Sequence, residues 1–484
     1  MKQLGLRPGK SEAVSRNRTE LNQAPGSIEG VRARICVVGS GYVGLTTALV
    51  LAHIGHDVDC VDIDPQKINL LNAGEAPFHE PLIRQFLEAC AGRISFSTDY
   101  VNAVASADVI FIAVGTPNLK TGKPDLGALR SAVREIGRNL GNGLTIVVNK
   151  STAPVGTAKA ISGMLQQELS DRNGAGSEVE FAVASNPEFL RQGSAMRDSL
   201  YPDRIVIGTE DPRCAVVLEA VYRPIIDQSF APPEFAPRPE GQNAVPYIVT
   251  APASAEMIKY SANAFLALKI SFINEIAEMA EMVGADVTEI SAAIGLDPRI
   301  GPDFLGAGVG WGGSCFGKDT LALVASGEDL GLDMRITRAA RDVNDHQRGR
   351  LVDKVEAELG GLDGKRVALL GLAFKPNTDD LRDSPALDLA KRLELKGATV
   401  VGYDPAVPEW RLAEEPSLAY AGAAKEALAD ADAAVLVTDW LEFKALPWKD
   451  LGAAMAQPLI FDARNFLDRE ELENGGFRYH GVGR

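Results

Sequence analysis

Several residue types and patterns are scarce in this chain, and each scarcity excludes a class of protein. The 484 residues include five cysteines and five histidines, with no CxxC pair and no zinc-ligand spacing, so we expect a reducing cytoplasm and no metal. Basic residues are outnumbered 49 to 65, which gives a net charge of -16 and argues against nucleic-acid or membrane-surface partners. No run is long and apolar enough to predict a membrane span.

The composition that remains is that of a globular protein with more than one core. Apolar residues make up 46% and charged residues 24% of the chain, which is long enough for two or three domains. Residues 1–30 lack an apolar stretch and predict a disordered lead in preference to a secretory signal, with a transit peptide as the second choice. Strand-like runs then alternate with helical patterns such as 126–140; the runs are 109–117, 144–152, 181–189 and 204–208. This alternation predicts a parallel, doubly wound sheet over 31–223.

The second half of the chain predicts a long helix and a second sheet. Residues 224–253 carry seven prolines and predict an irregular insert. The stretch 254–284 is apolar nearly all round, which predicts a helix of about 45 Å that is buried between domains or against a second subunit. This helix begins a predicted helical middle domain over 254–350. Residues 364–484 show a second pattern of strand, glycine turn and helix like the one at the start of the first sheet. We therefore expect an α/β fold in which two Rossmann-like domains are joined by this helix.

The motif GSGYVG has three glycines in the GxGxxG register, between a strand and a helix. Gly39 permits the tight turn, Gly41 lets a pyrophosphate approach the backbone, and Gly44 lets the helix pack on the sheet. The phosphates would lie at the helix N-terminus. Asp62 ends the next strand, where it would accept hydrogen bonds from the adenosine ribose and repel a 2′-phosphate. The motif predicts binding of NAD in preference to NADP.

The corresponding turn of the second domain reads GLAFKPNTDD and lacks the three glycines. Phe374, Lys375 and Arg382 offer a ring and two cations, which suit a nucleotide base or phosphate. The two cations could equally neutralise three aspartates on a solvated loop, namely Asp379, Asp380 and Asp383. The residues alone leave both interpretations open.

The stretch GVGWGGSCFGKD places one thiol among glycines. Nothing bulky flanks Cys315, and Lys318 and Asp319 follow it closely, so a substrate could reach the thiol and the charges could influence its ionisation. The alternative is that Cys315 is a small buried apolar residue.

Two other stretches favour a chemical role for this thiol. Lys259 and Asn263 are four residues apart on the apolar helix, where an unpaired charge would be costly. Glu188 follows a strand, at the sheet edge where α/β enzymes hold ligands. A thiol, a lysine, an amide and a carboxylate together predict a site for covalent catalysis.

The motifs, taken together and in order, resemble the UDP-glucose 6-dehydrogenase family over nearly the whole chain from residue 31. They are GSGYVG with Asp62, STAPVG, NPEFLRQGSA, KYSANAFLALKISFINE, RIGPDFLGAGVGWGGSCFGKD and LGLAFKPNTDDLRDSP. The resemblance implies an NAD-dependent, four-electron oxidation of UDP-glucose to UDP-glucuronate. It also implies a homo-oligomer, most simply a dimer, with an NAD-binding domain at 31–223, a dimerisation domain at 254–350 and a UDP-sugar-binding domain at 364–484.

The resemblance also implies a role for each candidate residue. Cys315 would be the nucleophile, with Lys259 and Asn263 stabilising the oxyanion, Glu188 as general acid or base, and Asp319 and Thr152 serving the water and proton steps. The implied cofactor-binding residues are Gly39, Gly41, Tyr42, Val43, Gly44, Asp62, Lys67, Thr116 and Arg382. The implied substrate-binding residues are Phe189, Leu190, Arg299, Gly312, Phe374, Lys375 and Arg464, with Arg299 often supplied across the dimer.

The chain departs from the family pattern at three places, of which the smallest is Thr-Ala-Pro at 152–154 in place of the familiar Thr-Val-Pro. Gln192 stands where many members have glutamate, so a carboxylate that could tune the site is replaced by an amide. The proline-rich stretch is longer than expected and could be a lid, a partner site or an unstructured insert. Alternatives to glucose are GDP-mannose and UDP-N-acetylhexosamine. A nucleotide sensor without catalytic activity would not need all five candidate residues, which are Cys315, Lys259, Asn263, Glu188 and Asp319. A dehydrogenase that carries out a single two-electron oxidation would need no cysteine.

Overall fold

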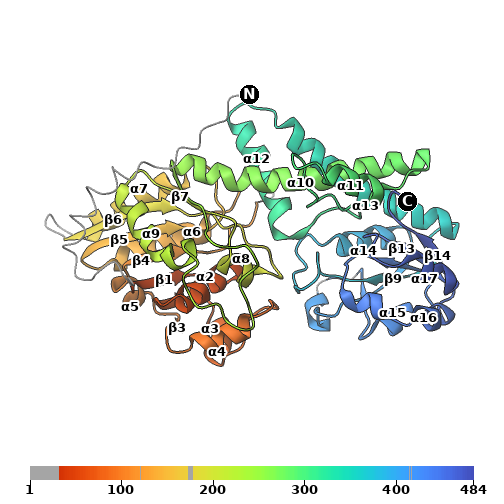
Figure 1. Cartoon of the computed structure of the whole chain (residues 1–484), viewed down its shortest axis with the longest axis horizontal. Coiled ribbons are helices and arrows are strands. Elements are labelled where there is room, and N and C mark those ends of the chain that lie inside the picture. The colour runs from red at the N-terminus through yellow and green to blue at the C-terminus, as the bar shows by residue number, and fades with distance from the viewer. Residues whose placement is uncertain (1–31, 120, 173–177, 414, 416) are drawn as a thin grey trace.

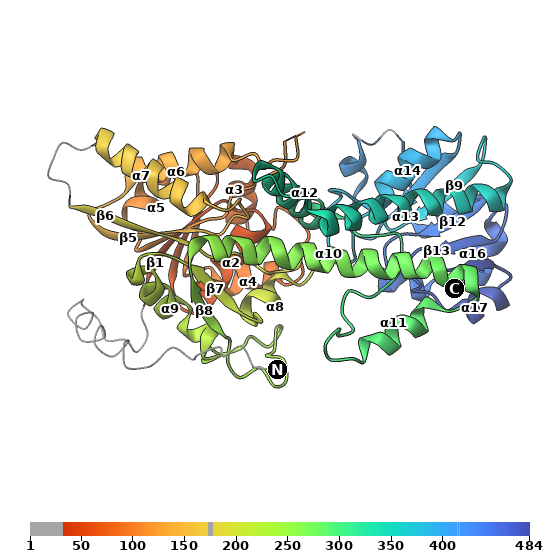
Figure 2. The same ribbon diagram turned by 90° about the horizontal axis from the view of Figure 1, so that it is seen from above.

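The computed structural model describes residues 32–119, 121–172, 178–413, 415 and 417–484. The expected lead at 1–30 lies outside these residues. The described chain forms two lobes, each built around a sheet, and the long helix α10 (Pro252–Val283) runs from one lobe to the other (Figures 1 and 2). Within the described residues, no helix is long and apolar enough to cross a membrane.

The N-terminal lobe contains an eight-stranded sheet in the order β3-β2-β1-β4-β5-β6-β7-β8. Its strands are β1 (Arg34–Val38), β2 (Asp57–Val61), β3 (Ile94–Ser97), β4 (Val109–Ile112), β5 (Gly143–Asn149), β6 (Val179–Ser185), β7 (Ile205–Gly208) and β8 (Tyr247–Thr250). The expected parallel sheet is confirmed from β3 to β6. It is wrong at the next pair, because β7 lies antiparallel to β6 through the bridge Ser185↔Gly208.

Helices cover both faces of this sheet. One face packs against α2 (Tyr42–His53), α4 (Ile83–Cys90), α8 (Ala195–Leu200) and α9 (Pro212–Ile226), and the other against α5 (Tyr100–Ala105), α6 (Gly127–Asn139) and α7 (Thr157–Arg172). The short helix α3 (Pro65–Asn72) follows β2. Strand side chains alternate between the two cores, so Ile35 and Val37 face α2 while Cys36 and Val38 face the α5–α7 side. This alternation explains why the strands are apolar throughout.

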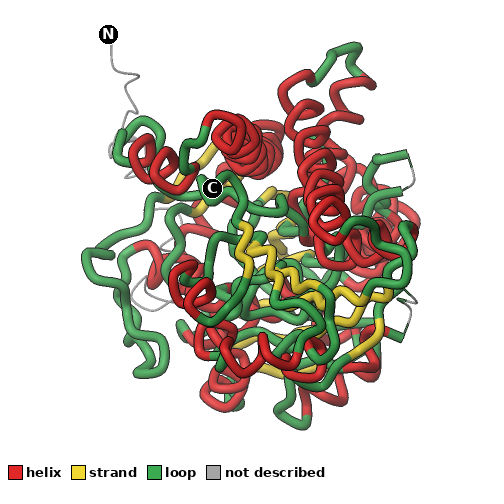
Figure 3. Tube along the Cα trace, turned by 90° about the vertical axis from the view of Figure 1, so that its right-hand side faces the viewer, coloured by secondary structure: helices red, strands yellow, loops and turns green. Residues whose placement is uncertain are grey.

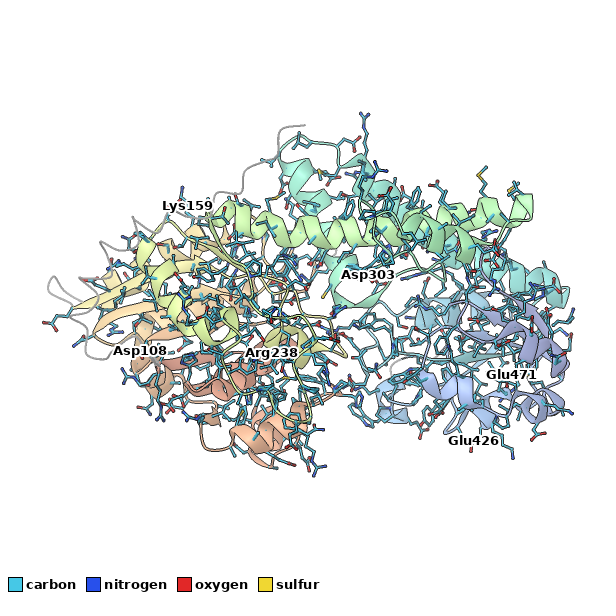
Figure 4. All side chains as sticks on the ribbon, in the orientation of Figure 1. Asp108, Lys159, Arg238, Asp303, Glu426 and Glu471 are labelled. Carbon is cyan, nitrogen blue, oxygen red and sulfur yellow. The ribbon has the colours of Figure 1, made fainter. Side chains whose placement is uncertain are left out.

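The proline-rich stretch 224–253 is more ordered than an irregular insert. Helix α9 continues through Pro224, and the edge strand β8 lies inside the stretch. Between them, residues 227–246 pack on the N-terminal lobe: the Phe235 ring lies 5.0 Å from that of Phe86, and Tyr201 donates to the Ala236 carbonyl oxygen at 2.7 Å. Figure 4 labels Arg238 on this segment. The segment therefore covers part of the core of the N-terminal lobe.

The expected long helix is confirmed as α10, whose 32 residues span about 48 Å. It packs against α12 (Gly313–Asp329) and α13 (Arg335–Leu359), and α11 (Val287–Gly295) follows it. Within one chain the helix is not buried on every side. Phe265, Phe272 and Met279, seven residues apart, have exposed fractions of 61%, 46% and 63%. They form an apolar stripe on one face.

The C-terminal lobe contains a six-stranded parallel sheet in the order β11-β10-β9-β12-β13-β14. Its strands are β9 (Arg366–Leu370), β10 (Thr399–Tyr403), β11 (Ala419–Tyr420), β12 (Ala433–Leu436), β13 (Leu459–Asp462) and β14 (Arg478–His480). Helices α13 and α14 (Pro385–Leu395) cover one face, and α15 (Ala424–Leu428), α16 (Trp448–Ala454) and α17 (Arg469–Asn474) cover the other. Figure 3 shows helices around the strands. The α/β fold with two doubly wound units is therefore confirmed.

Candidate active site

Cys315 lies in the first turn of α12, where the C-terminal lobe comes closest to the helix start. A Cβ on Gly312 would lie 2.1 Å from the Asp383 carbonyl oxygen, and one on Gly313 would lie 2.5 Å from the Phe374 ring. Gly313 also has φ +85°, a conformation that disfavours other residues. The glycines before the thiol therefore permit a close approach of the loop 371–384.

A buried ion pair lies beside this thiol. The Lys259 Nζ is 3.1 Å from the Glu188 Oε1, and both side chains are almost fully buried. Glu188 also accepts a hydrogen bond from the Leu190 backbone N–H at 2.8 Å. Helix α10 supplies the lysine, and the loop after β6 supplies the carboxylate. Two segments distant in the sequence thus meet at this ion pair.

Asp319 is fully buried and connects two further candidates. The Asn263 Nδ2 donates to its Oδ2 at 2.6 Å, and the Lys318 Nζ donates to its Oδ1 at 2.5 Å. Asp319 lies one turn after Cys315 on α12, and Asn263 lies one turn after Lys259 on α10. The two helices therefore present their polar side chains to the same space.

The charges of this cluster act on one another. Burial alone would lower the pKa of Lys259, but Glu188, Cys315 and Asp319 outweigh burial and raise it. Burial raises the pKa of the Cys315 thiol; Lys259 opposes this rise, and Glu188 and Asp319 add to it. Lys259 therefore holds its proton more tightly than burial alone would allow, and the Cys315 thiol loses its proton less readily than a free cysteine does.

The glycine turn between β1 and α2 has the shape that a pyrophosphate needs. Gly39 has φ +102°, and a Cβ on Gly44 would lie 1.8 Å from the Gly39 carbonyl oxygen. A Cβ on Gly41 would meet no atom within 4 Å, so the space in front of it is open. No side chain caps the N-terminus of α2, which leaves its N–H groups for an anion. This geometry fits NAD.

Asp62 follows β2 beside this turn. Burial alone would raise its pKa, but hydrogen bonds from the Ser40 and Asp64 backbone N–H groups and from the Ser40 hydroxyl lower it, as does Lys67. The Lys67 Nζ lies 3.9 Å from the Asp62 Oδ2. The carboxylate is therefore ionised, as the expected contact with a ribose requires.

The other candidate cofactor residues have varied surroundings. Thr116 donates to the Thr152 carbonyl oxygen at 2.6 Å, which brings two candidates together at the ends of β4 and β5. Tyr42 donates to the Asp379 Oδ1 of the C-terminal lobe at 3.0 Å. Val43 packs against the core of the N-terminal lobe. Arg382 pairs with Asp380 at 2.6 Å, which agrees with the neutralising interpretation of that loop.

The candidate substrate residues divide into a cluster and one outlier. Lys375 is partly buried, its Nζ lies 5.7 Å from the Phe374 ring centroid, and burial lowers its pKa. Arg464 donates to the Gly310 carbonyl oxygen at 3.3 Å and so connects the C-terminal sheet with the glycine-rich loop. The Phe189 ring lies 3.9 Å from the Arg204 guanidinium. The Arg299 side chain is 87% exposed and pairs with Asp297, so this chain does not bring it to the cluster.

Sequence reasoning missed one residue near this site, Lys150, and it did not find the contact that Gln192 makes. Lys150 follows β5, and its Nζ donates to the Asn186 Oδ1 at 3.1 Å. A lysine directly after an apolar strand at the carboxyl edge of a sheet was a signal that could have revealed it. The Gln192 Nε2 donates to the Asp380 Oδ2 at 2.9 Å, and this bond joins the two lobes. The amide thus serves a contact that a carboxylate would not make.

Comparison with protein families assigns all three parts of the chain. Residues 33–226 match the NAD binding domain of the UDP-glucose/GDP-mannose dehydrogenase family, 253–346 match its central domain, and 368–469 match its UDP binding domain. The chain belongs to this family. It is accordingly an NAD-dependent oxidoreductase. The candidate residues for NAD lie in the first of these domains except Arg382, which lies in the third, and Cys315, Lys259 and Asn263 lie in the second.

Curated relatives and solved structures agree with this assignment. A UDP-glucose 6-dehydrogenase of Bacillus subtilis is 41% identical over 454 residues, covering 93% of each chain. One of Rhizobium meliloti is 43% identical over 457 residues, covering 93% of this chain and 99% of the relative. The structure of a UDP-glucose dehydrogenase from Pyrobaculum islandicum superposes with a TM-score of 0.82 at 38% identity, covering 94% of this chain and 98% of that one.

Proposed function

We propose that this enzyme oxidises UDP-glucose to UDP-glucuronate in two successive hydride transfers. The observation that carries the proposal is the buried cluster in which Lys259 pairs with Glu188, and Asn263 with Asp319, around the Cys315 thiol. The names of the relatives support glucose as the sugar. A single oxidation to an aldehyde would not require a nucleophile at this place.

The thiol supplies what the second oxidation lacks. NAD held by the glycine turn and Asp62 would supply the acceptor for the hydride that leaves C6 in each oxidation. The Cys315 sulfur adds to the aldehyde, so that the second hydride leaves from a thiohemiacetal and a thioester remains. Water then releases the acid and restores the thiol. The covalent bond holds C6 in place between the two oxidations.

The polar residues handle charge and protons in these steps. Lys259 is cationic, and Asn263 is held by Asp319, so both donate to the oxygen that becomes negative on C6. Glu188 accepts protons as oxygen and sulfur lose them. Asp319 and Thr152 position the water that attacks the thioester. Phe374, Lys375 and Arg464 would contact the nucleotide part of the substrate.

A second candidate substrate class has structural support. A UDP-D-ManNAc dehydrogenase from Pyrococcus horikoshii superposes with a TM-score of 0.78 at 29% identity, covering 93% of this chain and 99% of that one. The decisive experiment is NADH formation with UDP-glucose, UDP-N-acetylhexosamines and GDP-mannose. We expect two NADH per sugar and the highest kcat/KM for UDP-glucose. A higher value for another sugar, or one NADH per sugar, would contradict the proposal.

The exposed stripe on α10 supports assembly as a dimer. Burying Phe265, Phe272 and Met279 against a second subunit would remove apolar surface from water. The exposed Arg299 would then reach the substrate site of the neighbouring subunit. We expect light scattering to give at least twice the mass of one chain, and Phe272→Glu to lower it. A monomer at assay concentration would disprove this assembly.

The thiols support the expected compartment. All five cysteines are free, and four of them are buried. A protein with a free nucleophilic thiol works best where thiols stay reduced. We therefore propose that the enzyme acts in the cytoplasm.

A further inference from the structure

A cavity of about 130 Å³ lies inside the N-terminal lobe, beside the candidate active site. Its walls come from α2, from the loop after β6, from α8 and from α9, with Val50, Leu51 and Ile225 among the apolar lining residues. Lys150 and Glu188 also line it. Among the described residues, no lining residue belongs to α10, α12 or the C-terminal lobe. Glu188 therefore contacts Lys259 and also borders a separate space.

Lys150 is held at the wall of this cavity. Its Nζ donates to the Asn186 Oδ1, which also accepts from the Tyr222 hydroxyl at 2.7 Å. The Asn186 amide donates to the Val206 carbonyl oxygen at 3.0 Å. Asn186 is almost fully buried, so three bonds fix the acceptor and, through it, the lysine. The ammonium therefore has a defined position.

Two lysines act on the one carboxylate of Glu188, and their pKa values shift in opposite directions. Burial lowers the pKa of Lys150 to about 8, helped by the charge of Lys259 and opposed by Glu188. The pKa of Lys259 is raised. Near pH 8 Lys150 is therefore present as both amine and ammonium, while Lys259 remains charged. The other ionisable groups that line the cavity are Arg191, Asp198, Tyr201, Asp203, Arg204 and Tyr222.

The cavity also offers a route to solvent. Arg191 and Asp203 line it and are exposed. A volume of this size has room for about four waters, since each takes up about 30 Å³. The polar groups of Lys150, Asn186 and Glu188 supply the partners that such waters need. Protons could therefore pass between the wall and the surface through water.

We propose that Lys150 relays protons between Glu188 and the water of this cavity. The inference rests on the proposed function, because oxidation of a primary alcohol to a carboxylate with two NAD and one water releases three protons into a buried site. In each transfer the protonated Glu188 gives its O–H proton to a cavity water, which passes a proton to the Lys150 amine; the resulting ammonium releases it to water nearer the surface, and both groups return to their starting forms. No other bond changes. Lys150 acts through Glu188 and is a positioning residue that does not touch the substrate.

The test compares Lys150→Arg with Lys150→Ala, using UDP-glucose and NAD. Arginine keeps the positive charge but does not lose its proton in this pH range. Relay requires the neutral amine, so the wild-type kcat should rise with pH through about 8. Both variants should lose this rise and fall about 10- to 100-fold in kcat. Ethylamine should restore Lys150→Ala at least fivefold, increasingly as pH rises, whereas tetramethylammonium should not.

The outcomes separate relay from a purely electrostatic role. The proposal would be overturned if Lys150→Arg kept the kcat and the pH profile of the wild-type enzyme. It would also be overturned if Lys150→Ala folded but ethylamine did not restore its activity. Thermal unfolding establishes that each variant is folded, and Lys150→Arg alone decides the matter if the alanine variant is not. If wild-type protein oxidises UDP-glucose while these predictions fail, the relay is wrong and the proposed function stands. If wild-type protein oxidises no nucleotide sugar, the proposed function itself is wrong.

Discussion

The two sheets of this enzyme begin in the same way and then diverge within one turn. In both, the first strand leads to a glycine with positive φ that packs against the residues just after a neighbouring strand. Gly39 packs against Ala113, after β4, and Gly371 packs against Thr438, after β12. In the N-terminal lobe α2 starts directly after the turn. In the C-terminal lobe the loop 371–384 intervenes before α14 and carries Phe374 and Lys375 toward the thiol.

The acid after the second strand shows the same divergence. The Asp62 Oδ1 accepts one hydrogen bond, from the Asp64 N–H, and its Oδ2 is used by Ser40. The Asp404 Oδ2 accepts bonds from Leu372, Ala373 and the Trp440 indole, and its Oδ1 accepts one from Ala406. A carboxylate oxygen has two lone pairs. The Oδ1 of each acid keeps one lone pair, so the two differ at Oδ2, where Asp62 accepts two bonds from Ser40 and Asp404 accepts three that tie the glycine turn to Trp440.

Alanine substitutions at the first lobe's glycines should separate shape from ligand space. Gly44→Ala would force a Cβ into the Gly39 carbonyl, so we expect a loss of about 4 kcal/mol or more in the free energy of unfolding. Gly41→Ala, the matched control, meets no atom; its stability should change by less than about 0.5 kcal/mol. Its KM for NAD should rise about tenfold, or ~1.4 kcal/mol. Chemical denaturation and steady-state kinetics measure these values, and equal stability of the two variants would contradict the account.

Substitution of the two acids should give opposite results. Asp404→Asn replaces an acceptor of four hydrogen bonds, so we expect a loss of about 2–3 kcal/mol in the free energy of unfolding with an unchanged KM for NAD. Asp62→Asn should cost about 1 kcal/mol and improve the use of NADP relative to NAD about tenfold, because the charge that repels a 2′-phosphate is gone. Wild-type enzyme should strongly favour NAD. If Asp62→Asn left the cofactor preference unchanged, its ribose role would be wrong.

The contact between the lobes should give the smallest effect. In Gln192→Glu an acid would face the Asp380 carboxylate in place of the amide donor. The new acid can donate a hydrogen bond only when it is protonated, so activity should be near normal at acid pH. As the pH rises and the acid ionises, activity should fall two- to tenfold, which corresponds to about 0.5–1.4 kcal/mol in the activation free energy. Gln192→Leu removes the bond without adding charge and should lose activity equally at every pH. A pH profile of Gln192→Glu identical to that of wild type would show that this contact does not matter.

The sequence predicted most of the fold and the family, because both depend on local patterns, and it named the residues of the candidate site. The turn at Gly39, the apolar strands and helix α10 follow from residue spacing, and the residues around Cys315 follow from motifs. The sequence did not reveal the reversal of β7 or the bond from Gln192 to Asp380, since both depend on how distant segments pack. Arg382 was left open for the same reason: its partner Asp380 becomes apparent only in the folded loop. Lys150 was missed because its role depends on a cavity.

The central claim is that Cys315 carries the sugar between the two oxidations, and its most direct test is intact-mass spectrometry after incubation with UDP-glucose and NAD. Cys315→Ser should form an ester whose poorer leaving group slows hydrolysis, so a covalent sugar adduct should accumulate while steady NADH formation is nearly lost. Cys315→Ala should form no adduct and no acid. Wild-type turnover in the folded alanine variant would contradict the account outright. Lost turnover without an adduct in the serine variant would contradict the trapped-ester step.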